Sequence, residues 1–183
     1  EIQFPSNLEI IGEGALRNTG ITELTIPTSV TSIKVKAFEN NTKLTKANLP
    51  NANYLEYANS YGTMQNNAAF SGCTLLADVT IDENVSKLPS SIFYGCTSLK
   101  EISLPDSVKE IGASAFYGCT ALMDIDFTNI TKIGGSAFYN CDGLTEVILP
   151  EALTSLGSSV FYDRDGLTVA TIPSSINTVP HQT

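Results

Sequence analysis

Apolar residues recur along this chain with a long and regular period. Six phenylalanines follow one another at steps of 32, 23, 23, 22 and 23 residues, at Phe38, Phe70, Phe93, Phe116, Phe138 and Phe161. Each of the four cysteines lies three residues after one of these phenylalanines, at Cys73, Cys96, Cys119 and Cys141. A shared period in two residue types indicates one structural unit that repeats along the chain.

The clearest unit is Leu99–Ala121, with the sequence LKEISLPDSVKEIGASAFYGCTA. Its opening, L-x-x-I-x-L, has the two-residue alternation of a strand. We expect Ile102 and Leu104 to point into the core and Glu101 and Ser103 to face solvent. Since one unit cannot bury its apolar face alone, neighbouring units must stack.

The rest of the unit predicts how the chain returns to the next strand. Pro105 should end the strand, because proline has no amide hydrogen for a sheet ladder. We expect the segment around Val108 and Ile111 to turn the chain. The stretch 113–119 should form a short helical or 3₁₀ segment, with Gly118 as its exit.

The repeats account for the whole chain as a single domain. We assign a partial repeat to residues 1–20, six full repeats to 21–166 with an insertion near 51–66, and a partial repeat to 167–183. A period of 20–29 residues with this opening is typical of a leucine-rich solenoid. The expected fold is therefore an α/β repeat: a right-handed solenoid with a parallel sheet on one face and short helical or 3₁₀ turns on the other.

The pattern LPxxVxxIxxxAFxxC, here LPDSVKEIGASAFYGC, resembles the BspA-like leucine-rich repeat of bacterial surface and secreted proteins. Nearly the whole chain shares it, with local departures at Leu16, Asn41, Asp82, Thr128 and Arg164. The resemblance implies a secreted or cell-surface adhesion module that binds a host or extracellular-matrix protein. The repeat carries no catalytic residue, so it implies neither an enzyme nor a cofactor.

The net charge of −9 and the isoelectric point near 4.4 narrow the choice of partners. Nucleic acids and anionic membranes attract lysine and arginine, so an acidic chain favours neither. No stretch reaches the roughly 18 apolar residues of a membrane span. We expect a protein partner, or a glycan, and no insertion into a membrane.

The cysteines share one inward-facing position of the repeat. We favour free thiols that act as small apolar side chains. Disulfides and a metal site remain as alternatives, but parallel Cβ vectors oppose the former and the lack of a C-x-x-C pair opposes the latter.

Outward-facing positions of the strands form an acidic column. The residue two after each opening position is acidic in five of seven repeats: Glu23, Lys46, Asp78, Glu101, Asp124, Glu146 and Val169. Asp126 adds another carboxylate beside Asp124. The column is suited to a basic protein partner, but a solvated face and a cation site are alternatives. We take Asp78, Glu101, Asp124, Asp126 and Glu146 as candidate binding residues.

One repeat, between Pro50 and Phe70, is nine residues longer than the usual 23. It contains Tyr54, Tyr57 and Tyr61, which would share one face if the stretch were helical. Insertions in solenoids often lie on the binding face, and tyrosine is common at recognition surfaces. The three tyrosines are therefore candidate partner-binding residues, although they could instead fold back over the adjacent coil.

The sequence contains few combinations of residues that could form an enzyme active site. His181 is the single histidine and lies near the end of the chain, which disfavours a Ser–His–Asp triad. The alternatives to adhesion are a structural spacer that presents another domain and a carbohydrate-binding accessory module. Against the second, aromatic residues outside the insertion are expected to be scarce on the surface.

Overall fold

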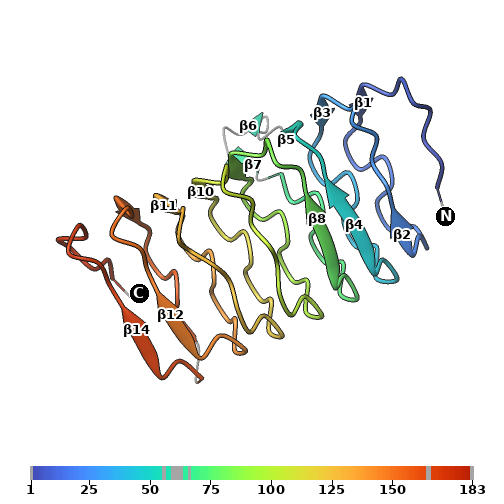
Figure 1. Ribbon diagram of the computed structural model, residues 1–183. Helices are drawn as coiled ribbons and strands as arrows, with labels where there is room; N and C mark the ends of the chain where they lie inside the picture. Colours follow the sequence, from blue (N-terminus) through green and yellow to red (C-terminus); the bar gives the residue numbers. More distant parts are fainter. Residues whose placement is uncertain (1, 55–56, 59–63, 66, 164–165, 182–183) are drawn as a thin grey trace.

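The computed structural model describes residues 2–54, 57–58, 64–65, 67–163 and 166–181. These residues form a solenoid of stacked coils, with the two ends of the chain at opposite ends of the stack (Figure 1). The strand pairs that connect neighbouring coils are parallel, as expected for a leucine-rich solenoid.

The L-x-x-I-x-L openings form the first strand face. Its strands are β2 (Glu23–Leu24), β4 (Lys46–Leu49), β8 (Asp78–Ile81), β12 (Glu146–Ile148) and β14 (Val169–Thr171). The order of pairing is β2-β4-β8 and, separately, β12-β14, with an isolated bridge from Glu101 to Asp124 between the two groups. The predicted register is confirmed in the clearest unit, where Ile102 is buried and Glu101 and Ser103 are exposed. Leu104 packs against the core but is only partly buried.

A second strand face occupies the segment that we expected only to turn the chain. Its strands are β1 (Ile10–Ile11), β3 (Ser32–Ile33), β5 (Asn53–Tyr54), β9 (Lys87–Leu88), β10 (Glu110–Ile111), β11 (Lys132–Ile133) and β13 (Ser155–Leu156). They pair as β1-β3-β5 and β9-β10-β11-β13. The expectation of a simple turn was wrong. Each of these segments pairs with the same segment of a neighbouring coil, and all of them except β5, whose side chains lie outside the description, place one apolar residue inward.

The expected helical or 3₁₀ stretch over 113–119 is also wrong: the described coils contain no helix, and residues 113–118 form successive turns. Backbone amides here alternate between two kinds of partner. Phe116 N donates to Ala137 O of the next coil at 2.8 Å. Its neighbour Tyr117 donates to Ser114 O of the same coil at 3.2 Å. Ser114 and Gly118 have φ of 54° and 70°, which a right-handed helix does not allow.

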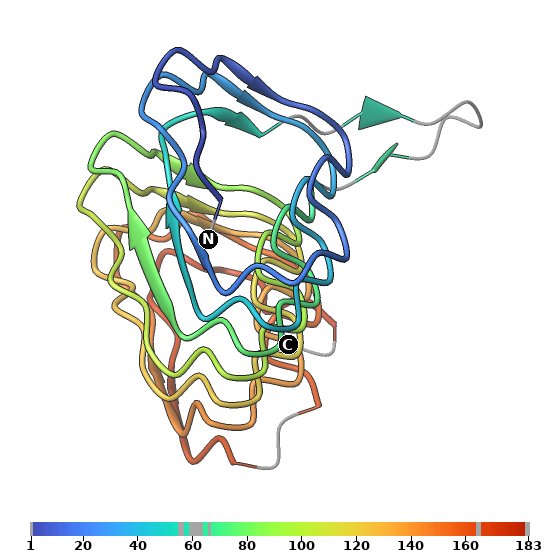
Figure 2. The same ribbon diagram turned by 90° about the vertical axis from the view of Figure 1, so that its right-hand side faces the viewer.

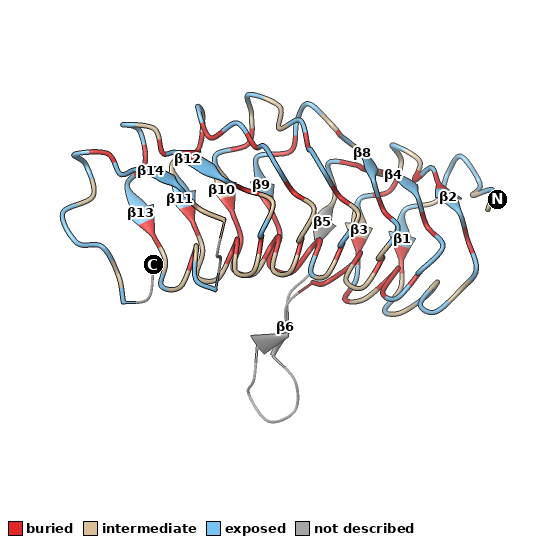
Figure 3. Ribbon diagram, turned by 90° about the horizontal axis from the view of Figure 1, so that it is seen from below, coloured by how far each residue is buried: buried red, intermediate tan, exposed pale blue. Residues whose placement is uncertain are grey.

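The core runs inside the coils along the whole stack (Figure 3). Its centre is a column of stacked phenylalanine rings, with centroids 5.1–6.0 Å apart and interplanar angles of 10–26°. Such pairs contribute about 0.5–1.5 kcal/mol beyond the burial of apolar area. The period of 23 thus brings equivalent side chains into direct contact.

The insertion after β5 contains two short antiparallel strands, β6 (Tyr57–Ala58) and β7 (Met64–Gln65). They project from the stack on the side away from β8 (Figure 2). The helical arrangement considered for the tyrosines is therefore wrong for Tyr54 and Tyr57, which lie in strands β5 and β6. Tyr61 lies outside the described residues.

Within the described ranges, no helix has the length and apolar character needed to cross a membrane.

Candidate binding surface on the first strand face

The first part of the acidic column contains an internal ion pair. Glu23, Lys46 and Asp78 are neighbours in register across β2, β4 and β8. Lys46 Nζ lies 2.6 Å from Asp78 Oδ2, and its hydrogen bond and the charge of Asp78 raise the pKa of Lys46. Asp78 is therefore already paired inside the protein, which weakens its case as a partner-binding residue.

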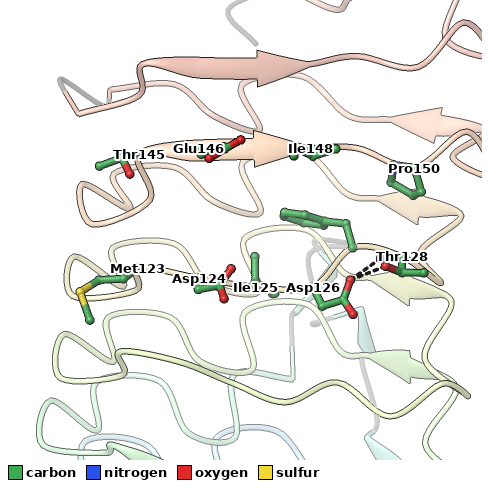
Figure 4. A pocket seen from close by; sticks show the side chains of 10 residues that line it. Met123, Asp124, Ile125, Asp126, Thr128, Thr145, Glu146, Ile148 and Pro150 are labelled. Carbon is green, nitrogen blue, oxygen red and sulfur yellow. Dashed lines mark hydrogen bonds between the residues drawn. The ribbon is translucent and has the colours of Figure 1, made fainter.

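Further along, carboxylates of the column face a groove. Asp124, Asp126 and Glu146 line a shallow open groove of about 680 Å³ between residues 123–128 and 145–150 (Figure 4). Glu101 lies one coil away and bridges to Asp124 through the backbone. The structure thus brings three of the five candidate carboxylates to one place, with Glu101 at its side.

The groove also has an apolar component. Met123 and Ile148 are 59% and 61% exposed, which is unusual for side chains of this size. Ile125 and Phe127 line the groove from below and are nearly buried themselves. Carboxylates beside exposed apolar groups suit a partner that has both positive charge and apolar side chains.

Asp126 has a structural task in the groove. Its Oδ1 accepts hydrogen bonds from Thr128 N at 2.8 Å and from Thr128 Oγ1 at 2.5 Å. These bonds hold the pKa of Asp126 below its ordinary value. Thr128 occupies the position of Pro105, so the carboxylate closes the turn by hydrogen bonding where proline elsewhere restricts the backbone. Asp82, which itself occupies the proline position of its repeat, accepts the same kind of bond from Asn84 N at 2.8 Å.

The sequence matches, over residues 1–62 and 63–183, the family model of the BspA type leucine rich repeat region, in six copies. The chain belongs to this family. A leucine-rich repeat protein from Bacteroides ovatus is similar at 30% identity and a TM-score of 0.72, over 87% of this chain and 39% of that one. One from Eubacterium ventriosum shares the fold at 19% identity and a TM-score of 0.63, over 93% and 49%.

The chain therefore spans less than half the length of both of these solved structures. No curated protein matches it. Members of the BspA-type family are typically bacterial surface proteins, and the leucine-rich solenoid is usually a non-catalytic repeat domain.

The cysteines of the BspA-type repeats are buried. Each thiol lies within 3.0–3.3 Å of the carbonyl oxygen of the preceding coil's phenylalanine and donates to it. Desolvation raises the pKa of Cys73 to about 12 and raises those of Cys96 and Cys119 as well. The described residues hold no group of three or more His, Cys, Asp or Glu placed to bind a metal.

Asn41 replaces the cysteine of this column without loss of its bond. Its Nδ2 donates to Leu16 O at 2.8 Å and to Phe38 O at 2.7 Å, and its Oδ1 accepts from Thr19 N at 2.9 Å. A fully buried amide with these partners keeps the first coils attached to each other.

The other predicted binding residues are not brought to the groove. Tyr54 belongs to β5 on the second strand face, and Tyr57 belongs to β6 in the projecting insertion. No strand pairing among the described residues connects either of them to the acidic column. Tyr61 lies outside the described part of the chain. The insertion and the column are thus separate candidate surfaces.

Sequence reasoning missed a second aromatic column. Four tyrosines stand directly after the core phenylalanines and stack on the surface, at Tyr94, Tyr117, Tyr139 and Tyr162. The first two pairs are nearly parallel with centroids 4.6 Å apart, and Tyr94 and Tyr162 are each 40% exposed. Burial raises the pKa of Tyr94 and of Tyr139.

The recurring F-Y pair was the signal that could have revealed this column, and the expectation that exposed aromatics are scarce outside the insertion was wrong. Within the column the ring faces cover one another, so edges and hydroxyls face solvent. Stacking on a sugar needs a free ring face, and the column does not strengthen the carbohydrate alternative.

Proposed function

We propose that this chain is a non-catalytic protein-binding module of a secreted or cell-surface adhesion protein. The groove on the first strand face supports this most directly, because it combines the carboxylates of Asp124 and Glu146 with the exposed side chains of Met123 and Ile148. The family, whose members are typically surface proteins, supports the location. A host or extracellular-matrix protein with a basic surface fits the charge of the groove.

The groove has no competing internal cation among the residues that line it. The ion pairs of the described residues involve Arg17, Lys36, Lys46 and Lys132, none of which lines the groove. Asp124 and Glu146 are therefore available to an external cationic group. Exposed pairs contribute about 0.2–1 kcal/mol each, so affinity must come from apolar contact as well as charge.

The test is a binding screen of this chain against immobilised matrix proteins and a glycan panel at physiological salt. Asp124→Asn combined with Glu146→Gln removes two charges from the groove and leaves the turn formed by Asp126 intact. The matched control, Glu83→Gln with Asp142→Asn, removes the same charge from exposed positions that do not line the groove.

A protein ligand should bind about 2- to 30-fold more weakly to the groove variant, and its affinity should be unchanged for the control. Equal weakening by both variants would show that net charge alone attracts the ligand. If no protein or glycan of the panel binds, the result would contradict the binding function and favour the alternative of a structural spacer.

A further inference from the structure

Strand pairing on the first face is interrupted between β8 and residues 101–104, and again at the groove. In β12, Thr145 O accepts from Val169 N at 3.3 Å and Leu149 N donates to Thr171 O at 3.0 Å, so these groups face β14. Alternate residues of a strand direct their backbone groups to opposite neighbours. The N–H and C=O groups of Glu146 and Ile148 therefore face the groove.

The opposite wall follows the register of the equivalent pair β4 and β8. There Asp78 N donates to Thr45 O of the preceding coil at 3.1 Å. Asp124 holds the position of Asp78 in its own repeat and bridges to Glu101 of the preceding coil, so alternation places the backbone groups of Ile125 on the groove side. Among residues 123–128 and 145–150, all of which the structure describes, no backbone hydrogen bond connects one wall to the other. The edge of β12 and the segment 123–128 thus lie apart with open space between them (Figure 4).

The same two coils are in contact on both sides of the groove. Before it, Gly143 N donates to Thr120 O at 3.1 Å. After it, Thr154 N donates to Thr131 O at 2.8 Å, and β11 pairs with β13. The separation is therefore local to the first strand face, and the groove is preformed by the packing of the coils around it.

A short turn accompanies this separation. Phe127 and Ile130 are three residues apart, whereas Leu104 and Val108, at the same positions one repeat earlier, are four apart. Phe127 also meets the core column edge-on, with its ring at 79° to that of Phe138. This repeat is thus the one in which both the turn length and the ring contact depart from the neighbouring pattern.

We infer that the groove receives an extended peptide, with basic side chains alternating with apolar ones, as an additional strand between the two walls. The inference rests on the proposed protein-binding function and specifies the partner and its mode of binding. Neighbouring strands lie about 4.7–4.9 Å apart, and an added strand forms ladder bonds to both edges at once.

Side-chain alternation sets the chemistry of the peptide. Outward-facing residues of the walls include Asp124 and Glu146, so outward side chains of the inserted strand meet carboxylates and are lysine or arginine. Inward-facing residues include Ile125 and Phe127, so inward side chains are apolar. The added strand keeps the in–out pattern of the coils on either side of it.

The test uses a capped six-residue peptide of alternating lysine and valine, which matches in length the six lining residues 123–128 of one wall. One comparison peptide carries N-methyl groups on alternate residues, which keeps its charge and removes ladder donors. A second replaces each lysine by glutamate. Affinity is measured by fluorescence anisotropy, and amide hydrogen exchange of Ile125 and Glu146 is followed by nuclear magnetic resonance.

The lysine–valine peptide should bind and slow exchange at both amides. The N-methylated peptide should bind about tenfold or more weakly, since several ladder bonds are lost. The glutamate peptide should not bind. Binding that is indifferent to N-methylation, absence of exchange protection, or no binding of the lysine–valine peptide would each overturn strand insertion.

These outcomes separate the inference from the proposed function. If a matrix protein still binds and still depends on Asp124 and Glu146 while the peptide results are negative, the binding function stands and only the insertion falls. If neither peptide nor protein binds, both fail.

Discussion

Close approach of the coils at Gly112 gives a sharp test of the packing. An ideal Cβ at this position would lie 2.6 Å from Ser90 N, 2.7 Å from Pro89 C and 2.8 Å from Leu88 O. These are backbone atoms of the preceding coil, so no side chain can rotate away. Gly112→Ala must therefore push two coils apart and stretch the bond from Gly112 N to Leu88 O, which is now 2.9 Å.

The magnitude follows from three contributions. Overpacking costs about 1–3 kcal/mol, and the weakened hydrogen bond about 0.5–1.5 kcal/mol. Alanine also restricts the unfolded chain, which offsets about 0.4–1 kcal/mol of this destabilisation. The free energy of unfolding should therefore fall by about 0.5–4 kcal/mol. In urea unfolding followed by circular dichroism, the midpoint should fall by about 0.25–2 M for a slope near 2 kcal/mol/M.

Gly12 supplies the matched control, because it holds the same position of its own repeat. A Cβ added at Gly12 would meet nothing within 4 Å. Gly12→Ala in the same chain should leave stability unchanged or raise it by about 0.4–1 kcal/mol. Equal midpoints for the two variants would refute the argument that contact between coils at this position is backbone on backbone.

Two further predictions concern the column of cysteines and its asparagine. Desolvation raises the pKa of Cys73 to about 12 and raises that of Cys96. The thiols of the native protein should therefore not react with a thiol reagent at pH 8, and they should react fully in denaturant. Reaction of the thiols in the native protein would contradict the buried column. Asn41→Leu should lower the free energy of unfolding by about 2–4 kcal/mol, because Leu16 O and Thr19 N lose their partner. Asn41→Cys should retain more of the stability. Urea midpoints that rank the two variants in the opposite order would refute this role.

The predictions that succeeded from sequence are those that follow from periodicity. Phe116 and Cys119 recur at a fixed step, so their burial in columns follows once coils stack. The in–out alternation of Glu101, Ile102 and Ser103 follows from the geometry of any strand. The location of the acidic column on an outer face follows from the same rule.

What failed depended on how the coils bond to each other. The segment around Ile111 looked like a turn because it is short, yet its backbone pairs with two neighbouring coils and is a strand. The stretch that ends at Cys119 looked helical, but its amides alternate between its own coil and the next one. The local sequence does not indicate whether a given amide will donate to a carbonyl oxygen of its own coil or of the next coil.

The candidate site was also predicted only in part from the sequence. The sequence identified Asp124, Asp126 and Glu146 as outward-facing carboxylates, but treated Asp78 as their equal. The lysine beside Asp78 was visible in the column, but its 2.6 Å ion pair depends on the register of β4 and β8. In the sequence, the groove was marked by no feature other than the turn between Phe127 and Ile130, which is one residue shorter than the same turn in the preceding repeat.

The sequence by itself therefore determined the family, the repeat, the core columns and the outward acidic face, because each follows from the spacing of residues along one chain. Only the tertiary structure decided the second strand face, the absence of helix in the described coils, the stacked tyrosines and the open edges beside Glu146. Those features depend on the distance and register between neighbouring coils, and these are set by backbone hydrogen bonds and packing across residues about 23 positions apart.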